Sequence, residues 1–131
     1  MREILFRGKR IDNGEWVHGS VIVFPCGGTC IAKKTELDFE LEQIEVDPAT
    51  IAQCTNLTDK NNAKIFEGDI IWGTGSKANM DNFVIRWSEA ICGFTAGEGK
   101  RVWPNLNQAT IGNYEIVGNI HDNPELLEWE I

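Results

Sequence analysis

Residues 4–24, ILFRGKRIDNGEWVHGSVIVF, hold two apolar runs on either side of a polar turn. Both runs are rich in branched and aromatic side chains, which favour β-strands. Between them, the dipeptide Asn13-Gly14 readily supplies the positive φ angles of a tight hairpin turn. The start of the chain is therefore expected to form an antiparallel β-hairpin.

The chain just beyond this hairpin also favours strands. Between residues 29 and 46 the apolar side chains recur with a period near two, which predicts two short strands or one strand and an excursion. Residues 47–51, DPATI, predict a capped helical turn, because Asp47 can accept hydrogen bonds from free amides and Pro48 suits the first helical position. Residues 123–128 predict a short capped helix.

Apolar strand pieces separated by polar or glycine-containing turns fill the second half of the chain. They lie at residues 64–72, 83–87, 92–96 and 114–121. Successive antiparallel strands of this kind are typical of a small barrel. We expect a mainly β fold (α+β with minor helix), with antiparallel hairpins followed by a small SH3-like, barrel-type C-terminal subdomain. Residues 1–131 should form one domain, with subdomains at 1–63 and 64–131.

Charge and hydropathy narrow the range of partners. The 131 residues include 20 acidic and 12 basic side chains, a formal net charge of -8. That charge disfavours nonspecific nucleic-acid binding, which depends on Lys and Arg at phosphates. No apolar run approaches the roughly 18 residues that cross a bilayer, and the first residues become charged before a signal-peptide core can form. We expect a cytoplasmic protein without membrane contact, whose partner is a protein or a second copy, with nucleic acid less favoured.

The four cysteines are expected to be free thiols. Cys26 and Cys30 flank a Gly-Gly turn that could present half of a zinc site, but Cys54 and Cys92 stand singly in the sequence. Structural zinc needs four ligands, so we expect these cysteines to be buried or surface thiols that bind no metal. No metal and no cofactor is expected.

Polar residues around a tight turn form a weak candidate site. Glu67, Asp69 and His121 could build a small catalytic centre dispersed in sequence, and Asp59 and Glu89 could join the carboxylates around a divalent cation. Carboxylates at turns more often accept hydrogen bonds from nearby amides. No signature of a common hydrolase, phosphate-binding loop or zinc protease is present, so an enzyme is not favoured and catalytic residues stay unassigned.

Five tryptophans are many for a chain of this length. Trp16, Trp72 and Trp87 lie inside apolar strands and are expected to be buried. Trp103 stands beside a proline and Trp129 in an acidic tail, so these two are the candidates for an interaction surface.

Residues 46–71, VDPATIAQCTNLTDKNNAKIFEGDII, closely resemble the characteristic pattern of the YopX family of phage and prophage proteins. The segments 2–8, REILFRG, and 115–127, EIVGNIHDNPELL, agree with the same family. Asn56 and Asn62 stand where the family usually has turn glycines, and asparagine is the other residue that tolerates left-handed backbone. Cys54 and Phe66 replace aromatic residues that are usual at those positions.

The resemblance implies a β-rich domain of mobile-element origin in a bacterial host, and it implies no particular chemistry. The leading hypothesis is an uncharacterised, non-enzymatic accessory protein that acts as a protein-binding or regulatory module. One alternative is a nucleic-acid binder or an acidic mimic of DNA. A second alternative is a small enzyme with a dispersed site.

Overall fold

The computed structural model describes residues 2–37, 40–74, 80–98, 101–103 and 106–130. For residues 74, 80, 81, 98, 101–103 and 128–130 it describes the backbone alone. The chain is mainly β, as expected. It divides into two compact units, Met1–Cys54 and Thr55–Ile131. The division falls inside one strand, because the end of that strand pairs with the next strand of the second unit.

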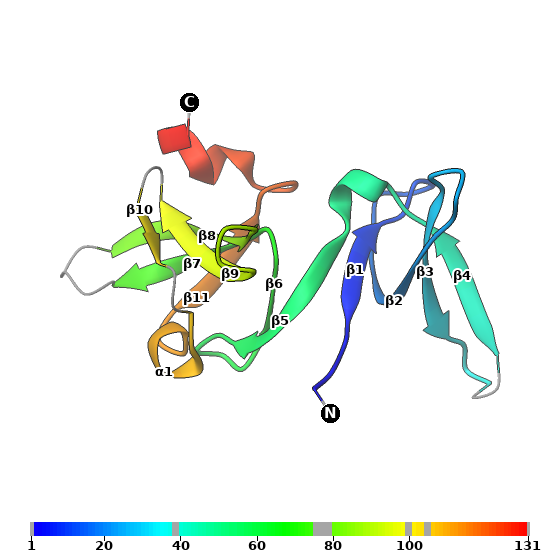
Figure 1. Ribbon diagram of the computed structural model, residues 1–131, viewed down its shortest axis with the longest axis horizontal. Helices are drawn as coiled ribbons and strands as arrows, with labels where there is room; N and C mark the ends of the chain where they lie inside the picture. The colour runs from blue at the N-terminus through cyan, green and yellow to red at the C-terminus, as the bar shows by residue number, and fades with distance from the viewer. Residues whose placement is uncertain (1, 38–39, 75–79, 99–100, 104–105, 131) are drawn as a thin grey trace. The chain divides into compact units, whose positions relative to one another are not determined.

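The first unit is an antiparallel sheet with the order β4-β3-β2-β1 (Figure 1). Its strands are β1 (Phe6–Lys9), β2 (Trp16–Val23), β3 (Thr29–Lys34) and β4 (Leu41–Glu45). On its other side β1 pairs with the start of β5 (Ala52–Thr58). The expected hairpin is therefore confirmed as β1–β2, and the segment after it forms two short strands.

This sheet curls until its two ends meet. An isolated bridge joins Arg10 to Val46, with Ile11 N donating to Glu45 O at 3.2 Å and Asp47 N donating to Lys9 O at 2.9 Å. The curl encloses one apolar cluster, which consists of Val17, Ile31, Ile44 and Val46 with Phe6, Val21 and Ile51 packed against it. Close approach of β2 and β3 requires Gly19, because a Cβ there would lie 2.3 Å from Ala32 O.

The β1–β2 turn differs from the expected tight turn. Only Gly14 has a positive φ, at 73°, and Asn13 does not. Arg10 N donates to Glu15 O and Gly14 N to Arg10 O, so the loop is longer than a two-residue turn. The Asn13 side chain instead accepts a hydrogen bond from Glu15 N at 2.9 Å.

The predicted capped turn is confirmed as the 3-10 helix η1 (Pro48–Thr50). Asp47 Oδ1 accepts a hydrogen bond from Ala49 N at 3.0 Å, and Pro48 opens the helix. The Thr50 hydroxyl accepts a hydrogen bond from Lys9 N at 2.8 Å. This hydrogen bond from Lys9 to Thr50 joins the helical turn to the end of β1.

The second unit is built on a five-stranded antiparallel sheet with the order β10-β9-β8-β7-β11. Its elements are β6 (Lys64–Phe66), β7 (Asp69–Thr74), β8 (Met80–Ser88), β9 (Gly93–Glu98), β10 (Arg101–Trp103), α1 (Gln108–Ile111), β11 (Glu115–Asn119) and η2 (Pro124–Glu130). Among the described strands β10 and β11 are opposite edges, so the sheet is open where a barrel was expected. Strand β10 and helix α1 were not anticipated either.

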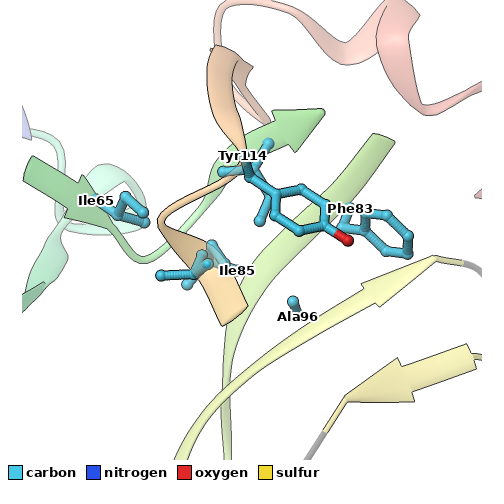
Figure 2. Close-up of a cluster of buried hydrophobic side chains, with 7 residues drawn as sticks. Ile65, Phe83, Ile85, Ala96 and Tyr114 are labelled. Carbon is cyan, nitrogen blue, oxygen red and sulfur yellow. The ribbon is translucent and has the colours of Figure 1, made fainter. Parts of the chain in front are cut away.

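Apolar layers cover both faces of this sheet in its middle. Ile71 and Phe83 are register partners on one face, and Ile70 and Val84 are partners on the other. The first cluster contains Ile65, Ile71, Phe83, Ile85, Ala96, Ile111 and Tyr114 (Figure 2). The second contains Ile70, Val84 and Leu127, with Ile120 and Leu126 packed against it. Burial on both faces explains why the strands of this unit read as continuous apolar runs.

Asparagine holds the left-handed backbone at the two positions expected from the family pattern. The φ angle is 67° at Asn56 and 65° at Asn62. No helix in the described part of the chain is both long and apolar enough to cross a bilayer.

Candidate functional site

The Asp59 carboxylate connects three segments of the second unit. Its Oδ1 accepts hydrogen bonds from Asn61 N and Ala63 N, each at 2.9 Å. Its Oδ2 accepts a third from Ile116 N at 3.1 Å, which reaches strand β11. Asp59 is buried, and both of its oxygens bind backbone amides. This arrangement favours a structural role over the cation-binding role considered from the sequence.

Lys60 strengthens the same junction. Its backbone N donates to Tyr114 O at 2.8 Å, and its Nζ lies 2.9 Å from Glu115 Oε2. The Asp-Lys-Asn motif thus fastens the β5–β6 turn to the start of β11.

The structure brings together the two segments that hold Glu67, Asp69 and His121. Asp69 pairs with Asn119 across β7 and β11, and Ile120 N donates to Gly68 O at 3.0 Å. Gly68 adopts a φ of 86°, which allows the turn that faces Ile120. Sequence alone paired these residues only by chemical type, and the register of β7 and β11 is what makes them neighbours.

Their side chains nevertheless occupy unlike environments. Asp69 is buried, and its Oδ2 accepts a hydrogen bond from Phe66 N at 2.7 Å. His121 is exposed, and its backbone N donates to Asn119 Oδ1 at 3.0 Å. Within the described ranges no three His, Cys, Asp or Glu side chains are grouped to hold a metal ion. The arrangement resembles a turn stabilised by carboxylate and amide groups more than a catalytic centre.

All four cysteines are free thiols. Cys26 and Cys92 are exposed, Cys30 is half-buried and Cys54 is buried in the first unit. The Cys26–Cys30 segment forms a turn in which Phe24 N donates to Gly28 O at 2.8 Å and Gly27 has a φ of 94°. The turn belongs to the β2–β3 connection and has a plain structural explanation.

The tryptophans are distributed differently from the expectation. Trp72 and Trp87 are 37% and 47% exposed, so their predicted burial is wrong, and Trp16 is half-buried. Trp103 lies on β10 and Trp129 within η2, but their side chains fall outside the described residues. The expected interaction surface therefore has no side-chain geometry here.

A different apolar surface, the hairpin patch, consists of Trp87, Ile91 and Phe94 on the β8–β9 hairpin. Trp87 and Phe94 are register partners, and their rings meet edge to face with centroids 5.3 Å apart. They continue the face of the buried pair Ile85 and Ala96. Trp87 and Ile91 are each 47% exposed because the covering layer ends before the hairpin does.

The β1–β2 hairpin also has a basic and aromatic face that was not expected from the sequence. The register places Arg7 opposite His18 and Lys9 opposite Trp16, so all four side chains share one face. The Arg7 guanidinium lies 4.6 Å from the Trp16 ring centroid, and Lys9 Nζ lies 5.5 Å from it. Both distances suit cation–π contacts. The sequence contains the pattern of this face as Arg7-x-Lys9 and Trp16-x-His18, which lie at equal distances from the hairpin turn.

Comparisons with known proteins agree with the fold. The family model described as YopX protein matches residues 5–128. The crystal structure of protein EF1440 from Enterococcus faecalis is similar, with a TM-score of 0.62, 24% identity, and coverage of 98% of this chain and 100% of that one. A likeness at this identity supports the fold alone. No curated protein matches the chain.

Proposed function

This chain belongs to the YopX protein family, and on that premise we propose that it is a phage or prophage accessory protein that binds another protein and has no catalytic activity. The proposed location is the cytoplasm of the bacterial host. The hairpin patch is the observation that carries the proposal. Aromatic side chains are enriched at the cores of protein interfaces, and charged side chains are depleted there.

Two features of the patch suit a protein partner. Trp87 exposes apolar surface against the Phe94 ring, and the backbone of both residues belongs to a regular hairpin whose turn carries exposed Ile91. A rigid aromatic group loses little conformational freedom on binding, and residues of this kind often dominate binding energies. The polar groups Asp59 and Asp69 accept hydrogen bonds from amides within the fold, which supports a role without catalysis.

The proposal is tested by affinity capture from host lysate at native expression, with wild-type chain and the variant Trp87→Ser. We expect a specific partner that wild type retains and Trp87→Ser loses. Val117→Ser is the matched control, because Val117 is also an exposed apolar residue of the same unit, on β11. Recovery of no partner above background, or equal recovery by Trp87→Ser, would count against the proposal. Circular dichroism confirms that both variants are folded.

A second candidate function is binding of single-stranded nucleic acid by the β1–β2 hairpin. The observation that favours it is the contact of Lys9 with Trp16 beside exposed His18, since cations and aromatic rings together bind unpaired nucleotides. Arg7 is buried and supports the Trp16 ring from within the fold. Labelled oligonucleotides should then bind at about 50 mM salt and dissociate steeply as salt rises. Absence of binding at the lower salt concentration would remove this candidate. Acidic mimicry of DNA is favoured only by the net charge. An enzyme with a dispersed site is favoured only by the adjoining segments that hold Asp69 and His121.

A further inference from the structure

Strand β4 is an edge of the first sheet, and part of its backbone faces outward. Val46 N donates to Thr29 O at 3.0 Å, so the backbone at this position faces β3. Because backbone direction alternates along a strand, Ile44 and Glu42 also face β3, while Gln43 and Leu41 face away. The hydrogen bond from Ile11 N to Glu45 O agrees with this alternation.

Contact between β4 and the end of β1 is confined to one bridge. Beyond the Arg10–Val46 bridge the chain turns into the β1–β2 loop and leaves β4. An open hollow of about 310 Å³ lies between them, lined by residues 10–12 and 42–45. Among the described strands only β3 pairs with the stretch of β4 that borders this hollow. The outward N–H and C=O groups of Gln43 therefore face space that a further strand could enter.

The hollow is acidic. Arg10 binds Asp12 through two hydrogen bonds, Nε to Oδ1 at 2.9 Å and Nη2 to Oδ2 at 2.8 Å. This contact raises the pKa of Arg10 and lowers the pKa of Asp12, so both stay charged and offset each other. Glu42 and Glu45 remain as the excess negative charge among the residues that line the hollow, and Lys33 of β3 stands opposite Glu42 in the register.

We propose that the β4 edge binds an extended, basic segment of a protein partner, which adds to the sheet as a new strand beside β4. Main-chain hydrogen bonds to Gln43 and Leu41 would supply affinity, and Lys or Arg side chains would approach Glu42 and Glu45. Leu41 and Ile11, which are 69% and 58% exposed, offer apolar contacts on either side. This inference rests on the proposed protein-binding function. It names the class of partner for the β4 edge, a surface distinct from the hairpin patch.

The charge of this edge argues against other occupants. A nucleic acid would bring phosphates toward Glu42 and Glu45. A second copy that paired β4 with β4 would place two acidic edge strands side by side, and repulsion between like charges disfavours that association. Acidic side chains on an edge strand can also serve only to prevent aggregation. The experiment below separates that role from binding.

The experiment uses the full chain labelled with ¹⁵N and an end-blocked octapeptide of alternating lysine and valine as the probe. We expect amide shifts at residues 41–45 and slower hydrogen exchange at Leu41 and Gln43. An octapeptide of alternating glutamate and valine should give neither effect. The lysine–valine octapeptide with every backbone nitrogen methylated keeps the positive charge but lacks all backbone donors, and it should bind at least about tenfold more weakly, as if about 1.4 kcal/mol were lost.

Variants locate the binding. Gln43→Pro removes an outward amide, and an edge strand tolerates proline at such a position. It should abolish exchange protection at Leu41. The double variant Glu42→Gln, Glu45→Gln should weaken binding about three- to tenfold, in proportion to two exposed charge pairs. Glu89→Gln removes an exposed carboxylate of the second unit and should leave binding unchanged.

Several outcomes would overturn the inference. These are an absence of shifts up to about 1 mM probe, equal binding of the N-methylated peptide, or equal binding by the double variant. Concentration-dependent dimers in light scattering that involve β4 would assign the edge to a second copy instead. Trp87→Ser should not change probe binding. Failure at β4 can therefore be told apart from failure of the hairpin patch.

Discussion

Trp87 on β8 lies directly opposite Phe94 on β9, and the two rings meet edge to face at 5.3 Å with an angle of 77° between their planes. Two residues further from the hairpin turn, on the same face, Ile85 and Ala96 are fully buried. One continuous sheet face therefore passes from the core to solvent within a single step of the pleat. This makes stability and binding separable at neighbouring positions.

Trp87→Ala is expected to cost much less stability than Phe83→Ala. Trp87 loses the edge-to-face contact, worth about 0.5–1.5 kcal/mol, and surface that is already half exposed. Phe83 is buried against Tyr114, with ring centroids 5.9 Å apart, and its truncation should cost about 3–5 kcal/mol. Urea unfolding followed by tryptophan fluorescence measures both changes, with circular dichroism for Trp87→Ala. Similar losses for the two variants would mean that Trp87 belongs to the core.

Asp59→Ala should destabilise the chain by about 2–4 kcal/mol, because it breaks three part-buried hydrogen bonds and leaves the amides of Asn61, Ala63 and Ile116 without their acceptor. Thermal and urea unfolding give the value. The control is Asp47→Ala, which removes a single exposed helix cap and should cost about 1 kcal/mol. If Asp59→Ala proves no worse than Asp47→Ala, the junction between β5, β6 and β11 does not depend on this carboxylate.

Asn62→Gly is expected to be neutral or slightly stabilising, and Asn62→Ala to cost about 1–2 kcal/mol. The reason is the φ of 65°, which glycine adopts freely and which places an alanine Cβ too close to the following carbonyl. Exposed Ala63, in the same turn, provides the control as Ala63→Ser. Equal stability of the Gly and Ala variants at residue 62 would contradict the left-handed conformation.

Tyr114 should ionise at higher pH than a free tyrosine. Its burial raises the pKa of the phenol above the ordinary tyrosine value of 10.0, since the charged form is poorly solvated. A raised folded-state pKa means that this contribution to stability is fully present below pH 10 and is lost as pH rises through the folded pKa. Tyr114 is the one tyrosine in the chain, so tyrosinate absorbance reports it directly. A midpoint equal to that in concentrated urea would show that the ring is not buried.

Local chemistry was enough for the sequence to predict several elements. The helical turn begins where Asp47 caps it and Pro48 occupies its first position, as predicted. Asn56 and Asn62 adopt left-handed backbone at the predicted turns. Glu67, Asp69 and His121 were grouped as a candidate site only because their side chains suit acid–base chemistry. That their segments adjoin follows from the β7–β11 register. The buried, amide-bound state of Asp69 then indicated a structural role for it.

Tertiary packing decided what local pattern could not. An apolar strand reads the same whether a layer covers it or not, so the burial predicted for Trp72 and Trp87 was wrong. A sheet closes into a barrel only when its two edge strands pair with each other. In the second unit the described edge strands β10 and β11 do not pair, so the sheet is open where a barrel was expected.

By itself the sequence determined the mainly β class, the first hairpin, the capped turn at residues 47–51 and the left-handed asparagines, because these follow from backbone preferences of a few adjacent residues. Only the tertiary structure decided which aromatic side chains reach solvent, which carboxylates accept buried amides and which strand edge lies open. Those outcomes depend on contacts between residues far apart in the chain, and such contacts leave no local mark in the sequence.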